Sequence, residues 1–213
     1  VEAALEGLMR QGVDRVILDL RRVAWGRLQE AVRVAQLFIG SGVLARTIGR
    51  DGRVIETYSA EPGRQRFGGR LAVVIDRSTM GAAEVIAAAV VEHRRGEVVG
   101  ERTFGGGGEQ QLFRLRDGGG LWLTTVKYAG PSGVAIMGSQ GRGAGGVAPT
   151  VEVARAELGL RPEELEQERE VGERAREREG EGARERAGEG GKEDVVLRRA
   201  IELLQAPVSP GRR

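Results

Sequence analysis

The sequence predicts an α/β fold for most of the chain, because apolar runs of strand length alternate with stretches of helical periodicity. The runs RVILDL at 15–20 and GRLAVVID at 69–76 are apolar enough for strands that are buried on both faces. Apolar residues recur at helical spacing over 28–39, and 81–93 is rich in alanine and valine. We therefore expect helices packed on β-sheet over residues 1–153.

The other expected elements are bounded by turn residues. Asp51-Gly52 and the DGGG stretch at 117–120 each join two strand-like runs, which predicts two hairpins. The elements expected from these patterns are an opening helix that ends at Gly12, strands at 43–48, 53–59 and 96–103, and hairpin strands at 110–116 and 121–128.

The last quarter of the chain differs in composition. Residues 154–193 consist largely of Glu, Arg, Gly and Ala, with too few apolar side chains to fold against a core. We expect this low-complexity segment to be disordered. Helical periodicity returns in VVLRRAIELLQA, so residues 194–207 are expected to form a last helix that docks on the core.

Composition excludes several classes of function. The 33 basic and 31 acidic residues leave a net charge of only +2, and the arginines of the tail are matched by glutamates, so we expect no nucleic-acid partner. The chain has no cysteine and one histidine, His93, which leaves almost no material for a metal site or a Ser-His-Asp triad. We expect no cofactor and no metal.

The hydropathy of the chain and its N-terminal residues give further expectations. No stretch reaches the roughly 18 apolar residues that are needed to span a bilayer. The first residues carry two acidic side chains and no long apolar run, so they do not form a signal peptide. Because they read as the interior of a helix, we expect N-terminal material to be missing.

Two stretches suggest chemistry. ERTFGGGGEQQLF at 101–113 resembles a phosphate-binding loop only superficially, since such a loop needs Gly-Lys-Ser/Thr before a helix, and here a strand-like run follows. In VVIDRSTMGAAEVIAAAVVEH a strand breaks and a helix of small residues begins at once. This turn either presents a nucleophile with oxyanion-binding amides, or is an ordinary strand-to-helix turn capped by Ser78 or Thr79.

Five stretches in order resemble the C-terminal processing peptidases, or tail-specific proteases. They are VILDLR, VVIDRSTMGAAEVIAAAV, EVVGERTFGGGGEQQLF, LWLTTVKYAGPSG and GGVAPTVEV, and the closing EDVVLRRAIELL resembles the last helix of the family. The resemblance implies a ClpP/crotonase-like fold, a serine-type endopeptidase that acts on a peptide or protein C-terminus, and an extracytoplasmic location. We do not expect these residues to include the PDZ domain of the family.

The resemblance also places the reactive residues. Glu84 matches the glutamate three residues after the family's serine nucleophile, which puts Gly81 at the nucleophile position. GERTFGGG matches the stretch that carries the general-base lysine and puts Gly106 at that position, while Gln110 matches a glutamine that assists the lysine. Glycine supplies neither a hydroxyl nor an amine, so both reactive groups are expected to be absent.

The oxyanion site is expected at Ala82 and at the turn DLRRVAWG, which matches a family turn that lends an oxyanion amide. In this turn Trp25 stands where the first of two family glycines would be, and Gly26 matches the second. A bulky indole at position 25 is expected to fill the cleft.

Three functions are compatible with these residues. The first is a degenerate peptidase homologue, catalytically impaired, that retains a peptide- or partner-binding cleft. The second is an active serine peptidase with displaced or partner-supplied residues; Ser78, Lys127 and Lys192 are the internal candidates, and each is expected to be structural or solvent-exposed. The third is an interaction protein that acts through its charged tail. His93 is expected to be a surface or capping residue. Membrane association and oligomeric state stay open.

Overall fold

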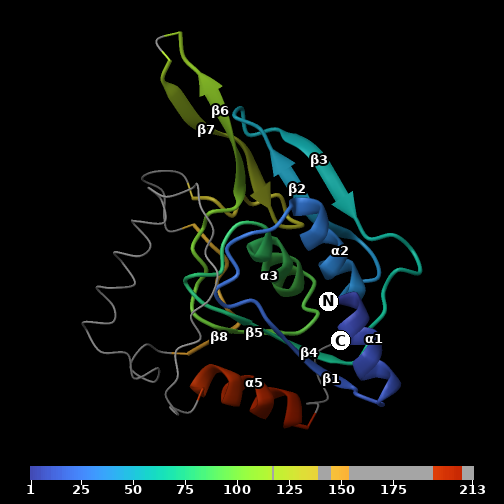
Figure 1. Cartoon of the computed structure of the whole chain (residues 1–213). Coiled ribbons are helices and arrows are strands. Elements are labelled where there is room, and N and C mark those ends of the chain that lie inside the picture. Colours follow the sequence, from blue (N-terminus) through green and yellow to red (C-terminus); the bar gives the residue numbers. More distant parts are fainter. Residues whose placement is uncertain (117, 139–144, 154–193, 208–213) are drawn as a thin grey trace.

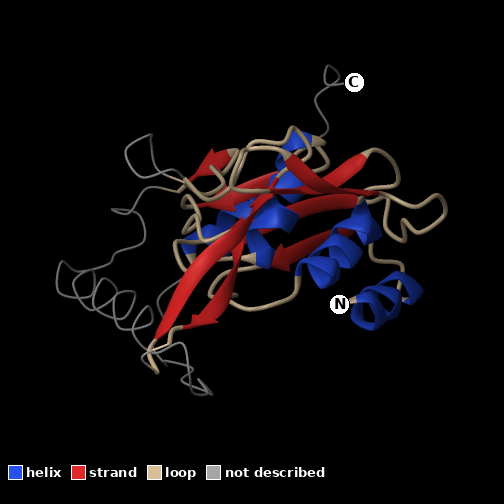
Figure 2. Cartoon of the chain, turned by 90° about the horizontal axis from the view of Figure 1, so that it is seen from above, coloured by secondary structure: helices blue, strands red, loops and turns tan. Residues whose placement is uncertain are grey.

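Two four-stranded sheets with helices between and outside them form the domain (Figures 1 and 2). The structure is a computed structural model and describes residues 1–116, 118–138, 145–153 and 194–207. The predicted low-complexity segment at 154–193, including Lys192, lies outside the described residues. The α/β fold expected from the sequence is confirmed.

The first sheet is entirely parallel and has the order β1-β4-β5-β8. The second sheet is antiparallel and has the order β3-β2-β7-β6. The strands are β1 (Arg15–Asp19), β2 (Val43–Ile48), β3 (Val54–Ser59), β4 (Arg70–Ile75), β5 (Glu97–Gly100), β6 (Gly108–Arg114), β7 (Gly120–Ala129) and β8 (Val151–Glu152).

Helices cover both faces of the parallel sheet. The helices are α1 (Glu2–Arg10), α2 (Leu28–Phe38), α3 (Ala82–Glu92) and α5 (Val195–Gln205). Helix α3 contacts β4 and β5 of the parallel sheet as well as β2 and β7 of the antiparallel sheet, so it lies between the two sheets. Helix α5 packs on the opposite, outer face of the parallel sheet (Figure 1).

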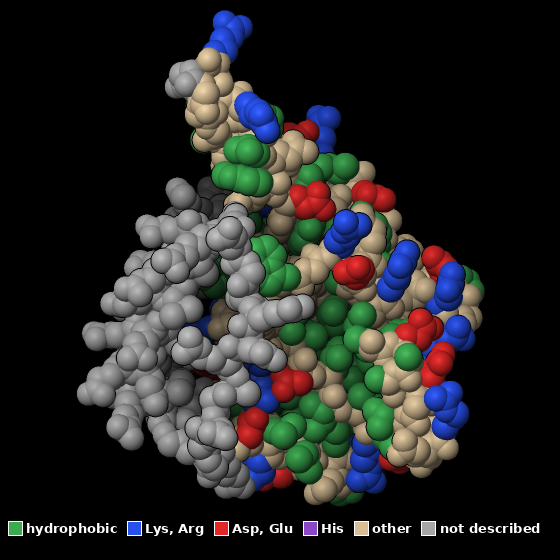
Figure 3. Space-filling view, in the orientation of Figure 1, with side chains coloured by type: hydrophobic (Ala, Val, Ile, Leu, Met, Phe, Trp, Pro, Cys, Tyr) green, Lys and Arg blue, Asp and Glu red, His purple; other side chains and the backbone are tan. Residues whose placement is uncertain are grey.

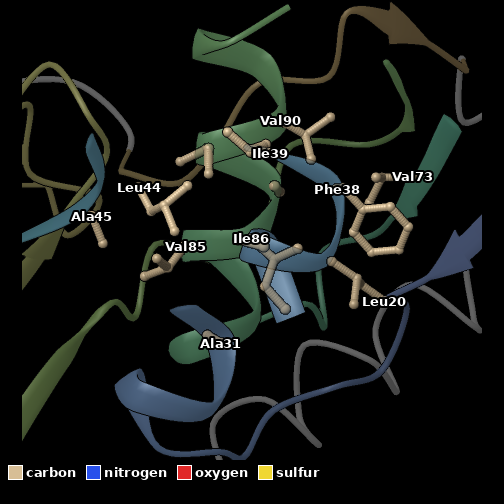
Figure 4. Close-up of a cluster of buried hydrophobic side chains, with 14 of the residues drawn as sticks. Leu20, Ala31, Phe38, Ile39, Leu44, Ala45, Val73, Val85, Ile86 and Val90 are labelled. Atoms are coloured by element: carbon tan, nitrogen blue, oxygen red, sulfur yellow. The ribbon is translucent and has the colours of Figure 1, made fainter. Parts of the chain in front are cut away.

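The side chains of β4 alternate between two apolar cores, as expected for a central strand. Leu71, Val73 and Ile75 join the larger core between the sheets, whereas Ala72 and Val74 join the smaller core beneath α5. Figure 4 shows the larger core, in which residues of α2, α3, β2 and β4 meet. Helix α3 is buried on nearly all sides, which explains its apolar composition without amphipathic spacing.

Polar contacts hold both ends of α5 against the domain. Asp194 caps the helix by accepting the Leu197 N–H at 2.9 Å, and its carboxylate also pairs with the guanidinium of Arg21 at 2.8 Å. At the other end, Arg70 donates to the carbonyl oxygens of Leu203 and Ala206 at 2.6 and 2.5 Å. The last helix is therefore fixed on the outer face of the sheet over its whole length.

The β6–β7 hairpin projects away from the rest of the domain in both views (Figures 1 and 2). It begins two residues before the predicted strand, at Gly108, because pairing with β7 extends back to the glycine run. The part of the chain that the structure describes holds no helix long and apolar enough to cross a bilayer.

Candidate functional site

A sharp strand-to-helix turn separates β4 from α3. At its end Gly81 has φ +66° and ψ −124°, a conformation that L residues with a side chain adopt only under strain. Turns of this kind expose a nucleophile at the start of a helix. A Cβ built on Gly81 would lie 3.8 Å from the Ala24 carbonyl oxygen, so a small side chain has room there. The turn thus has the geometry that can present a nucleophile, and a glycine stands at the position where the sequence resemblance places one.

Contacts to the segment after β1 fix this turn. The Thr79 hydroxyl donates to the Leu20 carbonyl oxygen at 2.9 Å and accepts the Asp76 N–H at 3.0 Å. The Met80 N–H donates to the Val23 carbonyl oxygen at 2.9 Å. The alternative expectation that Ser78 or Thr79 caps α3 is wrong, because Gly81 occupies the N-cap position and the Thr79 hydroxyl donates to Leu20, just after β1.

The carboxylate of Glu84 joins the nucleophile turn to the glycine run. It is fully buried, and it accepts the Gly81 and Gly106 N–H groups on one oxygen, each at 2.9 Å. The other oxygen accepts the Gly105 N–H at 2.7 Å and the Thr103 hydroxyl at 2.5 Å. One buried side chain therefore holds the two expected catalytic positions beside each other.

Burial and hydrogen bonding act on Glu84 in opposite directions. Desolvation raises the pKa of its carboxyl above the usual value, and the four donors from Thr103, Gly105, Gly81 and Gly106 lower it, with desolvation the larger effect. The Thr103 hydroxyl also accepts the Val147 N–H at 2.7 Å, so the network extends to the segment that precedes β8.

The glycines of the run are not equivalent. A Cβ on Gly105, Gly107 or Gly108 would lie 2.8–3.0 Å from the backbone of Gly145 and Gly146, the Ile136 side chain or the Val126 carbonyl oxygen. Gly105 and Gly108 exclude a side chain because backbone atoms approach closely, whereas at Gly107 the Ile136 side chain would have to shift slightly. At Gly106 the closest neighbours belong to the flexible Met80 side chain.

Met80 occupies the space in front of Gly106. A Cβ on Gly106 would lie 2.6 Å from the Met80 Cγ, 2.9 Å from its Sδ and 3.1 Å from the Phe104 Cδ1. A side chain at position 106 would therefore have to displace the methionine. The sequence signal for this obstruction is the long side chain of Met80, the residue just before the expected nucleophile position.

The expected oxyanion residues lie together at the start of α3. Ala82 is the first residue of the helix, where backbone N–H groups have no intrahelical acceptor. A Cβ on Gly26 would lie 3.7 Å from the Ala82 Cβ, so the turn after β1 borders the helix start. Trp25 is 76% exposed and does not fill a cleft, contrary to the expectation for this indole.

The other candidate residues lie apart from this centre or serve structural roles. Ser78 is exposed, and its N–H donates to the Asp76 carboxylate. Lys127 lies on β7 opposite Gly108, and Gln110 is exposed on β6. His93 is the C-cap residue of α3, as expected, while its Nε2 hydrogen-bonds the Val43 carbonyl oxygen of β2 at 2.7 Å. No cluster of metal-ligating side chains occurs among the described residues.

This strand-turn-helix, tied to a glycine run through a buried carboxylate, lies within an α/β fold of the ClpP/crotonase-like class. The sequence profile of peptidase family S41 matches residues 1–153, and the chain belongs to this family. The fold class and the resemblance expected from the sequence are thereby confirmed.

Relatives and solved structures agree with this assignment. A carboxyl-terminal-processing protease of Picosynechococcus sp. is 38% identical over 128 residues, which cover 60% of this chain and 30% of the relative. A chloroplastic C-terminal processing peptidase of Tetradesmus obliquus is 35% identical over 135 residues, covering 63% of this chain and 29% of that protein.

Among solved structures, a photosystem II D1 C-terminal processing protease is 33% identical, with a TM-score of 0.60 over 71% of this chain and 38% of that one. A structure of a peptidase from Parabacteroides merdae shares the fold at 17% identity, with a TM-score of 0.66 over 97% of this chain and 57% of that one. The chain spans about 30% of the length of the curated relatives that it matches.

Proposed function

We propose that this S41 domain binds polypeptide at the site between Gly81 and Gly106 and hydrolyses it at most inefficiently. The observation that carries the proposal is that any side chain at position 106 would have to displace Met80, whose Cγ lies 2.6 Å from a Cβ built there. Serine-type hydrolysis in this family needs a hydroxyl and a neutral amine that takes its proton. Glycine supplies neither group at position 81 or at position 106.

The expected loss of activity is large. Removing the nucleophile of a serine peptidase lowers turnover by on the order of 10⁶, and the remaining machinery provides on the order of 10³–10⁴ over the uncatalysed reaction. Ser78 does not offer a replacement, because it is exposed and lies before the sharp turn rather than at its end.

Two features of the site support the binding part of the proposal. The Glu84 network holds the nucleophile turn against the glycine run, and the amides at the start of α3 remain in place. Trp25 and Phe104 are 76% and 40% exposed, one in the turn beside Ala24 and the other next to Gly106. These aromatic surfaces suit contacts with the side chains of a bound peptide.

Restoring the missing groups tests the alignment and the role of Met80 together. The triple variant Gly81→Ser, Gly106→Lys, Met80→Ala is expected to react with a fluorophosphonate serine probe at position 81 and to cleave an unstructured peptide. The double variant that keeps Met80 is expected to react at least 10-fold more slowly, because the methionine obstructs the introduced amine.

The matched controls are the wild-type chain and Gly81→Ser alone, which has a hydroxyl but no base, and neither is expected to turn over peptide. Cleavage by the wild-type protein that disappears in Ser78→Ala would contradict the proposal and favour displaced catalytic residues. Thermal melts of each variant separate failure to fold from failure to react.

We further propose that the bound polypeptide presents its C-terminus and that the protein works outside the cytoplasm. The names of the relatives support both, since they include C-terminal processing enzymes and a chloroplastic one. Peptides with a free and an amidated C-terminus, compared in binding titrations, test the first point, and equal affinity would refute it. Fractionation of the source cells tests the second point.

A further inference from the structure

The projecting β6–β7 hairpin exposes apolar side chains on both of its faces. Its register places Leu112 opposite Trp122 on one face, and Phe113 opposite Leu121 on the other. Leu115 and Leu123 also lie on this second face. These six side chains are each 43–55% exposed, and Figure 3 shows apolar side chains on the hairpin where it leaves the body of the molecule. The domain core does not account for this pattern.

The outer edge of β6 carries unpaired backbone groups. Strand β6 is the last strand of its sheet, so the described residues place β7 on only one side of it. The Leu115 N–H donates to the Gly119 carbonyl oxygen at 2.8 Å, so these two residues form a hydrogen-bonded pair of the antiparallel ladder. Because hydrogen-bonded and non-bonded pairs alternate, Gln110, Leu112 and Arg114 direct their N–H and C=O groups outward.

This edge leads directly into the candidate site. Strand β6 begins at Gly108, and the preceding glycines donate their N–H groups to Glu84 beside Gly81. Residues 110–114, which follow a register shift at Glu109, offer roughly 17 Å of regular edge to an extended chain. A bound chain that continued past Gly108 would reach the site between Gly81 and Gly106, where the resemblance to the family places the reacting bond.

We infer that the outer edge of β6 binds an extended, apolar polypeptide segment as an added strand and directs it to the site between Gly81 and Gly106. The inference rests on the proposed function. Backbone hydrogen bonds to Gln110, Leu112 and Arg114 provide affinity, and the apolar side chains on both faces of the hairpin contact alternate residues of the segment. The charged side chains of the described hairpin residues lie near its two ends, at Glu109, Lys127, Arg114 and Arg116, whereas its middle is apolar, so a segment with an apolar middle fits best.

Backbone N-methylation of a peptide tests the added strand. The probe is a fluorescein-labelled apolar peptide of about a dozen residues, prepared unmodified and in two versions N-methylated at alternate residues. Only one alternation phase places its N–H groups against β6. Fluorescence anisotropy should show at least 10-fold weaker binding for one methylated version and less than a twofold change for the other.

Two variants at the same position separate backbone from side chain. Leu112→Pro removes one outward N–H, which an edge strand tolerates, and is expected to weaken peptide binding at least 10-fold. Leu112→Thr keeps the N–H and is expected to weaken it less than threefold. Thermal melts show whether each variant keeps the fold, and the N-methylated peptides test the inference on the wild-type chain in any case.

The outcomes distinguish this inference from the proposed function. If the peptide binds but neither the methylation phase nor Leu112→Pro changes its affinity, the edge inference is overturned and the proposed function stands. If no peptide binds at millimolar protein, both are overturned. A dimer in sedimentation that Leu112→Pro dissociates would show that a second copy occupies the edge, which also overturns the inference.

Discussion

The network around Glu84 and the β6–β7 hairpin are neighbours in the chain, yet they are built on opposite principles. The buried carboxylate of Glu84 accepts four hydrogen bonds. Its donors lie in the turn before α3 and in the segment from Thr103 to Gly106, and these bonds hold the two segments together. On the hairpin, large apolar side chains remain about half exposed and bury little against the domain.

The difference separates what holds the site together from what the site presents. A buried polar group must keep its partners, so the frame around Glu84 is rigid whether or not positions 81 and 106 carry reactive groups. The exposed hairpin contributes little to the stability of the fold. Its exposed apolar side chains therefore indicate a surface that binds a partner. The predictions below test this contrast from its largest expected effect to its smallest.

Substitution of Glu84 is expected to have the largest effect. In Glu84→Gln one oxygen becomes an NH₂ group, so two of the four donors lose their acceptor. Each unsatisfied donor costs about 1–3 kcal/mol, and the free energy of unfolding should fall by roughly 2–6 kcal/mol. Urea denaturation measures it.

Glu30 provides a matched control for this substitution. It is the third residue of α2, as Glu84 is of α3, but it is exposed and accepts a single N–H, that of Arg27, at 3.5 Å. Glu30→Gln should cost less than about 0.5 kcal/mol. A similar loss in both variants would show that helix capping, rather than the bridge to the glycine run, explains the effect.

The pH dependence of stability tests the balance of forces on Glu84. Burial raises the pKa of its carboxyl above 4.5, so the folded chain keeps the proton at pH values where the unfolded chain has released it. The contribution of this group to stability is then fully present below pH 4.5 and is lost as the pH rises above it.

The stability difference between the wild-type chain and Glu84→Gln should accordingly narrow as the pH is raised from 4 toward neutrality. Denaturation curves at several pH values measure this difference. If the difference widens instead, the four hydrogen-bond donors outweigh burial, and the pKa of Glu84 lies below its usual value.

The sequence predicted most of this architecture because its patterns are local. The strand run before Asp76 and the alanine-rich helix after Gly81 are visible in the residues themselves, and β4 and α3 match them closely. The Asp51-Gly52 turn likewise lies between β2 and β3. These elements need no knowledge of what they pack against.

The rest depended on contacts between distant segments. Glu84 served in the sequence only to align the nucleophile position, whereas its four donors become apparent only when the glycine run lies beside α3. The Met80 side chain in front of Gly106 is a matter of side-chain placement. The exposure of Trp25 depends on the path of the turn after β1, which no periodicity encodes.

The docking of α5 should show an intermediate effect. Leu204 lies in the smaller core with Val196 and Ala200, and it is only 7% exposed. Leu204→Ala should lower the free energy of unfolding by about 2–3 kcal/mol, because it removes buried methyl groups and leaves a cavity. Ile201, on the same helix but 40% exposed, supplies the control, and Ile201→Ala should cost less than about 1 kcal/mol. Equal losses would mean that α5 does not pack as a core element.

The smallest effect is expected on the hairpin, where apolar side chains are removed without loss of stability. Leu121 and Leu123 are each 45% exposed on the same face of the β6–β7 ribbon. The double variant Leu121→Thr, Leu123→Thr introduces β-branched strand formers at both positions, so the free energy of unfolding should change by less than about 0.5 kcal/mol per site. Peptide affinity should nevertheless fall, because the side chains that contact an added strand have gone. A loss of stability comparable to that of Leu204→Ala would instead show that these leucines belong to the core that stabilises the fold. The hairpin would then not differ from the Glu84 network as a region that serves binding rather than folding.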